Sequence, residues 1–228
     1  MKSKSLPSGT RKSAKYRILI VEDHPIFRQG MIQLINHEPD LVVCEEAETA
    51  VAAILAIQKK QPDLALIDLT LKGTNGIELI KNIKVQFPGL PVLVLSMHEE
   101  SLYAARAMMA GARGYVMKQE AASQVMLAIR TVLKGEFYLS ATMNSTFISK
   151  FIGGPSAPAN SLVDNVSDRE LEILQLIGKG RTSREIAADI NISIKTVESH
   201  RAHLKEKLQL KTATELIRFA VEWMNRAV

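Results

Sequence analysis

Residues 17–25 read RILIVEDHP, and no other stretch of the sequence says as much about the fold. The run Ile18–Val21 is continuously apolar, which is typical of a strand covered on both faces of a parallel sheet. Two acids, Glu22 and Asp23, follow it directly. The pair His24-Pro25 favours the start of a helix, because proline suits a first helical turn. The stretch therefore predicts a buried strand, an acidic loop and a helix in succession.

The same alternation continues along the next part of the chain. Apolar runs like the first, at 17–21, predict four further strands, at 41–47, 64–67, 92–95 and 114–117. Apolar residues spaced three and four apart predict helices between them, at 26–35, 50–57, 77–87, 102–109 and 121–133. Five successive β-α repeats predict an α/β fold with a doubly wound, five-stranded parallel sheet of the flavodoxin-like kind, over residues 17–138.

The segments outside this domain have different compositions. Residues 1–16 are basic and rich in serine, and they predict a disordered tail that serves either solubility or non-specific contact with phosphates. Residues 139–164 contain glycine, proline and serine with little periodicity and predict a linker. Residues 165–228 show helical patterns and no strand-like run, so they predict a second, smaller all-α domain.

The net charge of +5 is unevenly distributed. Residues 1–17 hold six basic residues and no acid, 18–164 hold 12 basic and 15 acidic residues, and 165–228 hold 11 basic and nine acidic residues. The acidic middle argues against nucleic acid along the whole chain, whereas the basic end permits it. No apolar run approaches the roughly 20 residues of a membrane span, so we expect no membrane association and no signal peptide. The single cysteine, Cys44, is expected to be a buried strand residue and favours a cytoplasmic location.

Polar side chains follow the predicted strands at one edge of the sheet. Glu22 and Asp23 follow the first strand, Asp68 the third, Ser96 the fourth and Lys118 the fifth. Ligand-binding and catalytic residues of doubly wound sheets lie at this edge, beside the point where the strand order reverses. Carboxylates suit Mg²⁺, a carboxylate can attack phosphorus, and a lysine neutralises phosphoryl oxygens. The set therefore predicts phosphoryl transfer to an aspartate.

Residues 17–138 resemble the receiver domain of two-component response regulators. The matching residues are Glu22, Asp23, Asp68, Gly76, Ser96, Tyr115 and Lys118. The resemblance implies that Asp68 is phosphorylated by a sensor histidine kinase or a small phosphodonor. The implied Mg²⁺ ligands are Glu22, Asp23, Asp68 and the backbone carbonyl of Thr70. Ser96 and Lys118 are implied to hold the phosphoryl group, and Tyr115 to change rotamer on activation.

Three nearby residues add detail to this resemblance. Lys72 stands where the family often has proline, and Ser96 stands where it often has threonine but keeps the hydroxyl. His98, two residues after Ser96, either tunes the access of water to the phosphoryl group or is an ordinary surface residue.

The C-terminal sequence predicts four helices. Ser167 and Glu170 have the spacing of a capping box at the first, a turn at 191–193 separates the second from the third at 194–208, and the fourth runs from Thr212 to Trp223. Two helices joined by a tight turn indicate a helix-turn-helix. The residues expected to share the buried face of the third helix are Ile194, Val197, Leu204 and Leu208. Its opposite face carries small and polar residues, which suit a major groove.

Residues 170–216 resemble the LuxR-type DNA-binding domain. The matching features are Asp168-Arg169-Glu170 at its start, the turn Gly178-x-Gly180, Glu185-Ile186-Ala187, TVESH at 196–200 and Lys207-Leu208. A receiver followed by this domain is the layout of NarL/FixJ-type regulators. The resemblance implies base-facing positions at Glu198, Ser199 and Ala202 and phosphate contacts by Lys195, Thr196 and Lys205. His203 lies on the same predicted face. The last helix resembles the family's dimerisation surface through Leu216, Phe219, Ala220 and Trp223, although Trp223 is equally compatible with an ordinary core position.

We therefore expect a phosphorylation-dependent, DNA-binding transcription regulator, not an enzyme, that forms a homodimer when active. Phosphorylation would either expose the third helix or promote dimerisation. A haloacid-dehalogenase-type hydrolase would need a second aspartate at position 70, where threonine stands. A dinucleotide-binding enzyme would need a glycine-rich turn at 22–25. A receiver that acts only through protein partners is the remaining alternative.

Overall fold

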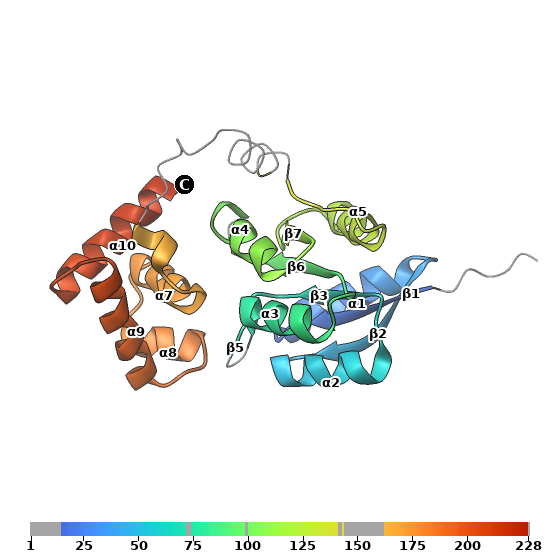
Figure 1. Cartoon of the computed structure of the whole chain (residues 1–228), viewed down its shortest axis with the longest axis horizontal. Coiled ribbons are helices and arrows are strands. Elements are labelled where there is room, and N and C mark those ends of the chain that lie inside the picture. The colour runs from blue at the N-terminus through green and yellow to red at the C-terminus, as the bar shows by residue number, and fades with distance from the viewer. Residues whose placement is uncertain (1–14, 72–73, 99, 141–142, 144–161, 228) are drawn as a thin grey trace, which may run out of the picture.

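The computed structural model describes residues 15–71, 74–98, 100–140, 143 and 162–227, and Figure 1 shows an α/β domain beside a smaller all-helical domain. The predicted tail at 1–16 and linker at 139–164 lie mostly outside the described residues. Within those residues, no helix combines the length and the apolar character needed to cross a bilayer.

Five parallel strands form the sheet of the first domain. They are β1 (Tyr16–Val21), β2 (Leu41–Ala47), β3 (Leu64–Ile67), β6 (Val92–Ser96) and β7 (Gly114–Met117). Their order across the sheet is β2-β1-β3-β6-β7, which confirms the predicted doubly wound sheet. The order reverses at β1, so the carboxyl ends of β1 and β3 lie beside the crevice where ligands of such sheets bind.

Helices cover both faces of this sheet (Figure 1). Ile18 and Ile20 of β1 pack in a cluster with α1 (Pro25–His37) and α5 (Ala122–Leu133). Leu19 and Val21 point the other way, toward α2 (Ala50–Lys60), α3 (Gly76–Gln86) and α4 (Glu100–Ala110). The continuous apolar runs are explained by this double coverage. Cys44 is only half-buried, contrary to expectation, because β2 is an edge strand.

A short hairpin that the sequence did not predict follows Asp68. It consists of β4 (Thr70–Leu71) and β5 (Thr74–Asn75), and the side chain of Asn75 then caps α3 by accepting the backbone N–H of Ile77. Gly76 packs directly beneath this loop: a Cβ there would lie 2.3 Å from the carbonyl oxygen of Asp68. Only glycine therefore permits this path of the chain past Asp68.

The second domain contains a 3₁₀ helix, η2 (Leu162–Asn165), and four α-helices: α7 (Asp168–Gly178), α8 (Ser183–Asp189), α9 (Ile194–Lys207) and α10 (Ala213–Ala227). The capping box of Ser167 and Glu170 is confirmed, and Ser193 caps α9. The expected burial of Val197, Leu204 and Leu208 is confirmed. The expected burial of Ile194 is wrong: this first residue of α9 is 45% exposed, and the buried stripe begins one turn later.

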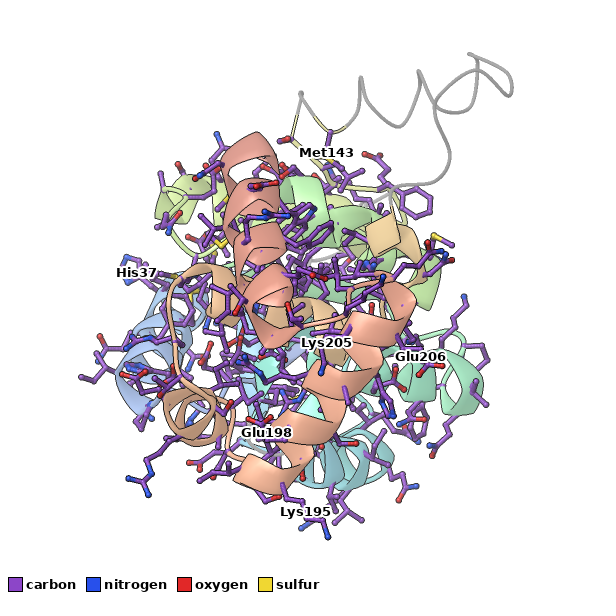
Figure 2. All side chains as sticks on the ribbon, turned by 90° about the vertical axis from the view of Figure 1, so that its left-hand side faces the viewer. His37, Met143, Lys195, Glu198, Lys205 and Glu206 are labelled. Carbon is purple, nitrogen blue, oxygen red and sulfur yellow. The ribbon has the colours of Figure 1, made fainter. Side chains whose placement is uncertain are left out.

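Helix α7 lies between the receiver-like domain and α9 (Figure 1). Buried apolar residues of α7 belong to the same cluster as those of α3 and α4. Figure 2, viewed from the side of the helical domain, shows α9 in front, with Lys195, Glu198, Lys205 and Glu206 along it and the α/β domain behind.

Candidate functional site

Three carboxylates converge at the carboxyl edge of the sheet. Glu22 and Asp23 follow β1 and Asp68 follows β3, and each offers an oxygen within 4.8 Å of the others'. Glu22 is 3% exposed and Asp68 is 6% exposed, so two of the acids are nearly removed from solvent. Parallel strands end at the same edge, and for that reason residues 46 positions apart meet here.

Lys118, at the end of β7, pairs with two of these acids. Its Nζ lies 2.8 Å from Asp68 Oδ2 and 2.5 Å from Glu22 Oε2, and it also stands over the ring of Phe27. Burial raises the pKa of Asp68, and Lys118 opposes this shift without cancelling it. Burial and the neighbouring Asp68 charge likewise raise the pKa of Glu22. Burial alone would lower the pKa of Lys118, but the two carboxylates raise it.

The other oxygen of Asp68 has no such partner. Oδ1 is buried and accepts no hydrogen bond from the described part of the chain. A buried carboxylate oxygen of this kind is costly unless something else satisfies it. A hard cation such as Mg²⁺, which binds carboxylate oxygens, fits this oxygen and the adjacent Glu22 and Asp23.

The two remaining predicted pocket residues lie on β6 and β7. Ser96 is fully buried, and its Oγ accepts the backbone N–H of His98 at 3.2 Å. Tyr115 is 1% exposed and points inward, where its hydroxyl donates to the carbonyl oxygen of His98 at 2.8 Å. Burial raises the pKa of this hydroxyl well above its usual range, so it is a donor at neutral pH. Thr70 hydrogen-bonds His98 through its side chain, at 3.0 Å between Oγ1 and Nε2.

His98 is a central residue rather than an ordinary surface residue. Burial lowers the pKa of its imidazole, and the ring stacks on Tyr103 with 4.4 Å between centroids. Tyr103, 1% exposed on α4, donates its hydroxyl to Gln175 Oε1 of α7 at 2.9 Å. Hydrogen bonds and ring contacts therefore run continuously from Ser96 to the second domain.

Arg106 of α4 joins the domains through three hydrogen bonds. Its guanidinium donates to the carbonyl oxygens of Val163 and Val166, at 3.0 and 2.8 Å, and to Asp168 Oδ1 at 3.0 Å. Lys81 reaches the other oxygen of Asp168 at 3.2 Å. None of these contacts was predicted from the sequence, in which Asp168 was noted only as part of the LuxR-type resemblance, because nothing in the spacing of the residues indicates which surfaces of two domains meet.

Arg28 was also missed. It donates to the backbone carbonyl of Glu22 at 2.7 Å and to the carboxylates of Glu46 and Glu48 at 2.7 and 2.8 Å. It therefore ties the acidic loop after β1 to the end of β2. The sequence does contain a signal for this ion pairing: the first predicted helix has a single arginine, and three acids lie at 45–48, at the end of the second predicted strand.

Helix α9 presents most of its predicted DNA-binding residues to solvent. Those that are exposed are Lys195, Thr196, Glu198, Ser199, Ala202 and His203, while Lys205 is half-buried. They form one outward face along the helix, as the labelled residues in Figure 2 illustrate. His203 lies at the edge of this face, with its Nδ1 3.8 Å from Glu170 Oε1 of α7. The geometry of the face suits a groove, and the individual DNA contacts remain predictions.

The fold and the acidic pocket together are those of the response regulators. Two protein-family models match the chain and support this class. One for the response regulator receiver domain matches residues 18–130, and one for bacterial regulatory proteins of the luxR family matches residues 164–220. The oxygen regulatory protein NreC of Staphylococcus carnosus is 34% identical over 210 residues, covering 90% of this chain and 97% of NreC. The chain belongs to the two-component response regulators with a LuxR-type DNA-binding domain, and is a transcription regulator rather than a conventional enzyme.

Solved structures are similar over both domains. A structure of RcsB from Salmonella typhimurium is 26% identical with a TM-score of 0.64, covering 92% of this chain and 98% of that one. RcsB from Salmonella enterica serovar Typhimurium bound to promoter rprA in the presence of the phosphomimetic BeF₃⁻ is 27% identical with a TM-score of 0.59, covering 91% and 98%.

Proposed function

We propose that a sensor histidine kinase phosphorylates Asp68 and thereby controls how this cytoplasmic regulator binds DNA as a dimer. The observation that carries the proposal is the carboxylate of Asp68, which has one oxygen paired with Lys118 and the other buried without a hydrogen bond among the described residues. A carboxylate held in this way is oriented and still has an oxygen to offer as a nucleophile.

The residues of the pocket fit the chemistry of transfer. An oxygen of Asp68 forms a bond to the phosphorus of a phosphohistidine donor, the P–N bond breaks, and the electron pair stays with the donor's imidazole. Lys118 already lies beside Asp68 and would pair with a phosphoryl oxygen, while the hydroxyl of Ser96 would donate to another. Mg²⁺ held by Glu22, Asp23, Asp68 and the carbonyl of Thr70 would neutralise charge on the phosphoryl group.

The signal would leave the pocket through His98. This residue contacts Ser96 and Thr70 on the pocket side, accepts the hydroxyl of Tyr115 at its carbonyl, and stacks on Tyr103. A phosphoryl group bound by Ser96 would disturb these contacts, with Tyr115 changing rotamer as part of the same shift. The hydrogen bond from Tyr103 to the second domain would then weaken, favouring separation of the domains.

The contacts between the domains favour control by dimerisation over release of a blocked helix. The receiver side holds α7, through Asp168, Glu172 and Gln175. The predicted DNA-binding face of α9 is exposed in the same arrangement (Figure 2). The contacts with the receiver therefore restrain the position of the whole helical domain and do not cover the predicted DNA-binding face of α9. Binding to neighbouring half-sites of DNA requires two such domains to be free to pair. Of the residues expected on a dimerisation surface of α10, Leu216 and Ala220 are fully buried, and Phe219 and Trp223 pack against the core. Ile217 and Val221, one turn apart and exposed on α10, offer an apolar surface for that pairing instead.

A binding experiment with a phosphodonor mimic tests the proposal. We expect beryllofluoride with Mg²⁺ to convert the wild-type protein to a dimer and to tighten its binding to promoter DNA, and Asp68→Asn to abolish both effects. Asp63→Asn is the matched control, because Asp63 is exposed just before β3, at the opposite end from Asp68. A full response in Asp68→Asn would refute the assignment of the acceptor. Dimerisation without any DNA binding would instead support action through protein partners alone.

A further inference from the structure

A second group of metal-ligating side chains lies in the DNA-binding domain. Glu170 of α7 and His200 and His203 of α9 each offer a ligand atom, and the three atoms lie within 4.8 Å of one another. Among the described residues, the other group of this kind is the acidic pocket of Glu22, Asp23 and Asp68, which shares no residue with this one. The Glu170 side chain is 4% exposed and that of His203 is 57% exposed, so the group opens to solvent on one side.

The separation of the ligand atoms fits a shared cation better than a direct contact. Glu170 Oε1 and His203 Nδ1 are 3.8 Å apart, which is too long for a hydrogen bond. Two ligands of a tetrahedral Zn²⁺, at 2.0–2.2 Å from the metal, lie about 3.4 Å apart. His200 and His203 are three residues apart on one helix, so both imidazoles reach the same side of α9. Small side-chain rotations would bring one ligand atom each of Glu170, His200 and His203 to bonding distance of a single Zn²⁺ ion.

The carboxylate of Glu170 is already oriented by its other contacts. Its Oε2 accepts the ammonium of Lys207 at 2.6 Å and the backbone N–H of Ser167 at 2.8 Å. Both donors use the same oxygen, so Oε1 is directed toward the imidazole of His203. Hydrogen bonds that orient a ligating carboxylate in this way strengthen metal sites.

The protonation states also suit a cation. Burial lowers the pKa of His200, so its imidazole is neutral near pH 7 and can coordinate. Burial would raise the pKa of Glu170, but the hydrogen bonds from Lys207 and Ser167 lower it, so the group is a carboxylate. The charges of Lys207 and Arg169 also act on His200 and oppose a cation, which sets a limit on its affinity.

We propose that Glu170, His200 and His203 bind one divalent transition cation, with Zn²⁺ the best match. Two imidazoles and one carboxylate are a common donor set for zinc, with water in the fourth position. The cation would connect α9, the predicted recognition helix, to α7, the helix that contacts the receiver. The inference does not depend on phosphorylation, because it concerns a site within the second domain.

Metal titration of the full-length protein tests this site. The protein is freed of metal and of any affinity tag, kept in excess Mg²⁺ to occupy the acidic pocket, and titrated with Zn²⁺ by calorimetry and with Co²⁺ by visible absorption. We expect one equivalent to bind, and His203→Gln to weaken the affinity at least tenfold. The exposed position of His203 makes this variant compatible with folding, which thermal unfolding would verify.

His37→Gln is the matched control, because His37 is an exposed histidine at the end of α1, far from α9 (Figure 2). It should leave the binding curve unchanged. Equal binding by wild type and His203→Gln, or no binding by wild type, would overturn the proposal. A thiolate-to-cobalt absorption band would also overturn it, since it would assign the metal to Cys44.

Discussion

Replacement of Arg106 by alanine should open the two domains without phosphorylation. Arg106 donates three hydrogen bonds to η2, its flanking residues and α7, and one of them goes to the carboxylate of Asp168. Arg106→Ala removes all three and leaves the receiver pocket untouched. Because Arg106 lies on α4 and its partners lie beyond residue 162, the loss falls on the contact between domains rather than on either core.

The size of the expected change in free energy follows from the solvent exposure of Arg106 and Asp168. A hydrogen bond to a charged group contributes about 1.5–3 kcal/mol when buried, and partial exposure reduces this. The Arg106 side chain is 22% exposed and that of Asp168 is 13% exposed, and Lys81 still holds Asp168 in the variant. We therefore take about 2 kcal/mol for the whole change, which shifts the ratio of closed to open molecules about 30-fold.

Two measurements check this prediction. Small-angle scattering of unphosphorylated Arg106→Ala should give a larger radius of gyration than wild type, and titration of a promoter fragment should give up to about 30-fold tighter binding. Beryllofluoride should remove the difference in affinity. Arg113→Ala is the control, since Arg113 bonds the carbonyl of Gly135 within its own domain. If Arg106→Ala matched wild type in both measurements, the closed arrangement would have no part in regulation.

Three further predictions follow from individual residues. Burial raises the pKa of Asp68 above its ordinary value of 3.8, so the folded state binds a proton more tightly than the unfolded state, and stability falls as pH rises from 3.8 through the folded pKa. In Mg²⁺-free buffer, Asp68→Asn should therefore raise the free energy of unfolding at pH 7 and flatten its pH dependence in urea titrations. Gly76→Ala should destabilise the protein by about 1–3 kcal/mol or more, because the added Cβ would meet the backbone of Asp68. Gly30→Ala should instead stabilise it by about 0.5–1 kcal/mol, because no atom lies within 4 Å of the added carbon. Thermal denaturation of the two variants and the wild type measures both changes. Lys195→Ala should weaken binding to unrelated DNA sequences equally and lower the salt dependence by about one ion, while Lys134→Ala on the receiver should change neither.

The acidic pocket formed by Glu22, Asp23 and Asp68 was predictable because the fold topology fixes where its residues lie. Once five β-α repeats predict a parallel sheet, the residues after each strand must share one edge, and Glu22, Asp68 and Lys118 meet there. The contacts among these three residues can be predicted without knowing how side chains pack elsewhere in the domain. The same reasoning failed for Cys44, because continuous apolar composition does not reveal which strand lies at an edge.

Contacts between separately folded domains were not predictable in this way. Arg106 and Asp168 are 62 positions apart with a linker between their domains, so periodicity within either domain carries no information about their pairing. The role of His98 was open for the same reason, since its burial depends on Tyr103 and on the approach of α7. Glu170 was predicted as a helix cap, but its second contact, with Lys207 of α9, required the packing of two helices.

The residues of α7 support the proposal that control acts on the position of the whole helical domain. At about 100° per residue, Asp168, Glu172 and Gln175 fall on one side of the helix and Glu170 falls on the opposite side. The first three contact the receiver, and Glu170 contacts Lys207 of α9. Because α7 is packed in the core of its own domain, a shift on the receiver side moves α7 and α9 together. In the mechanism proposed above, the predicted recognition helix would therefore keep its exposed face in both states, and phosphorylation of Asp68 would change where that face is held relative to a second copy.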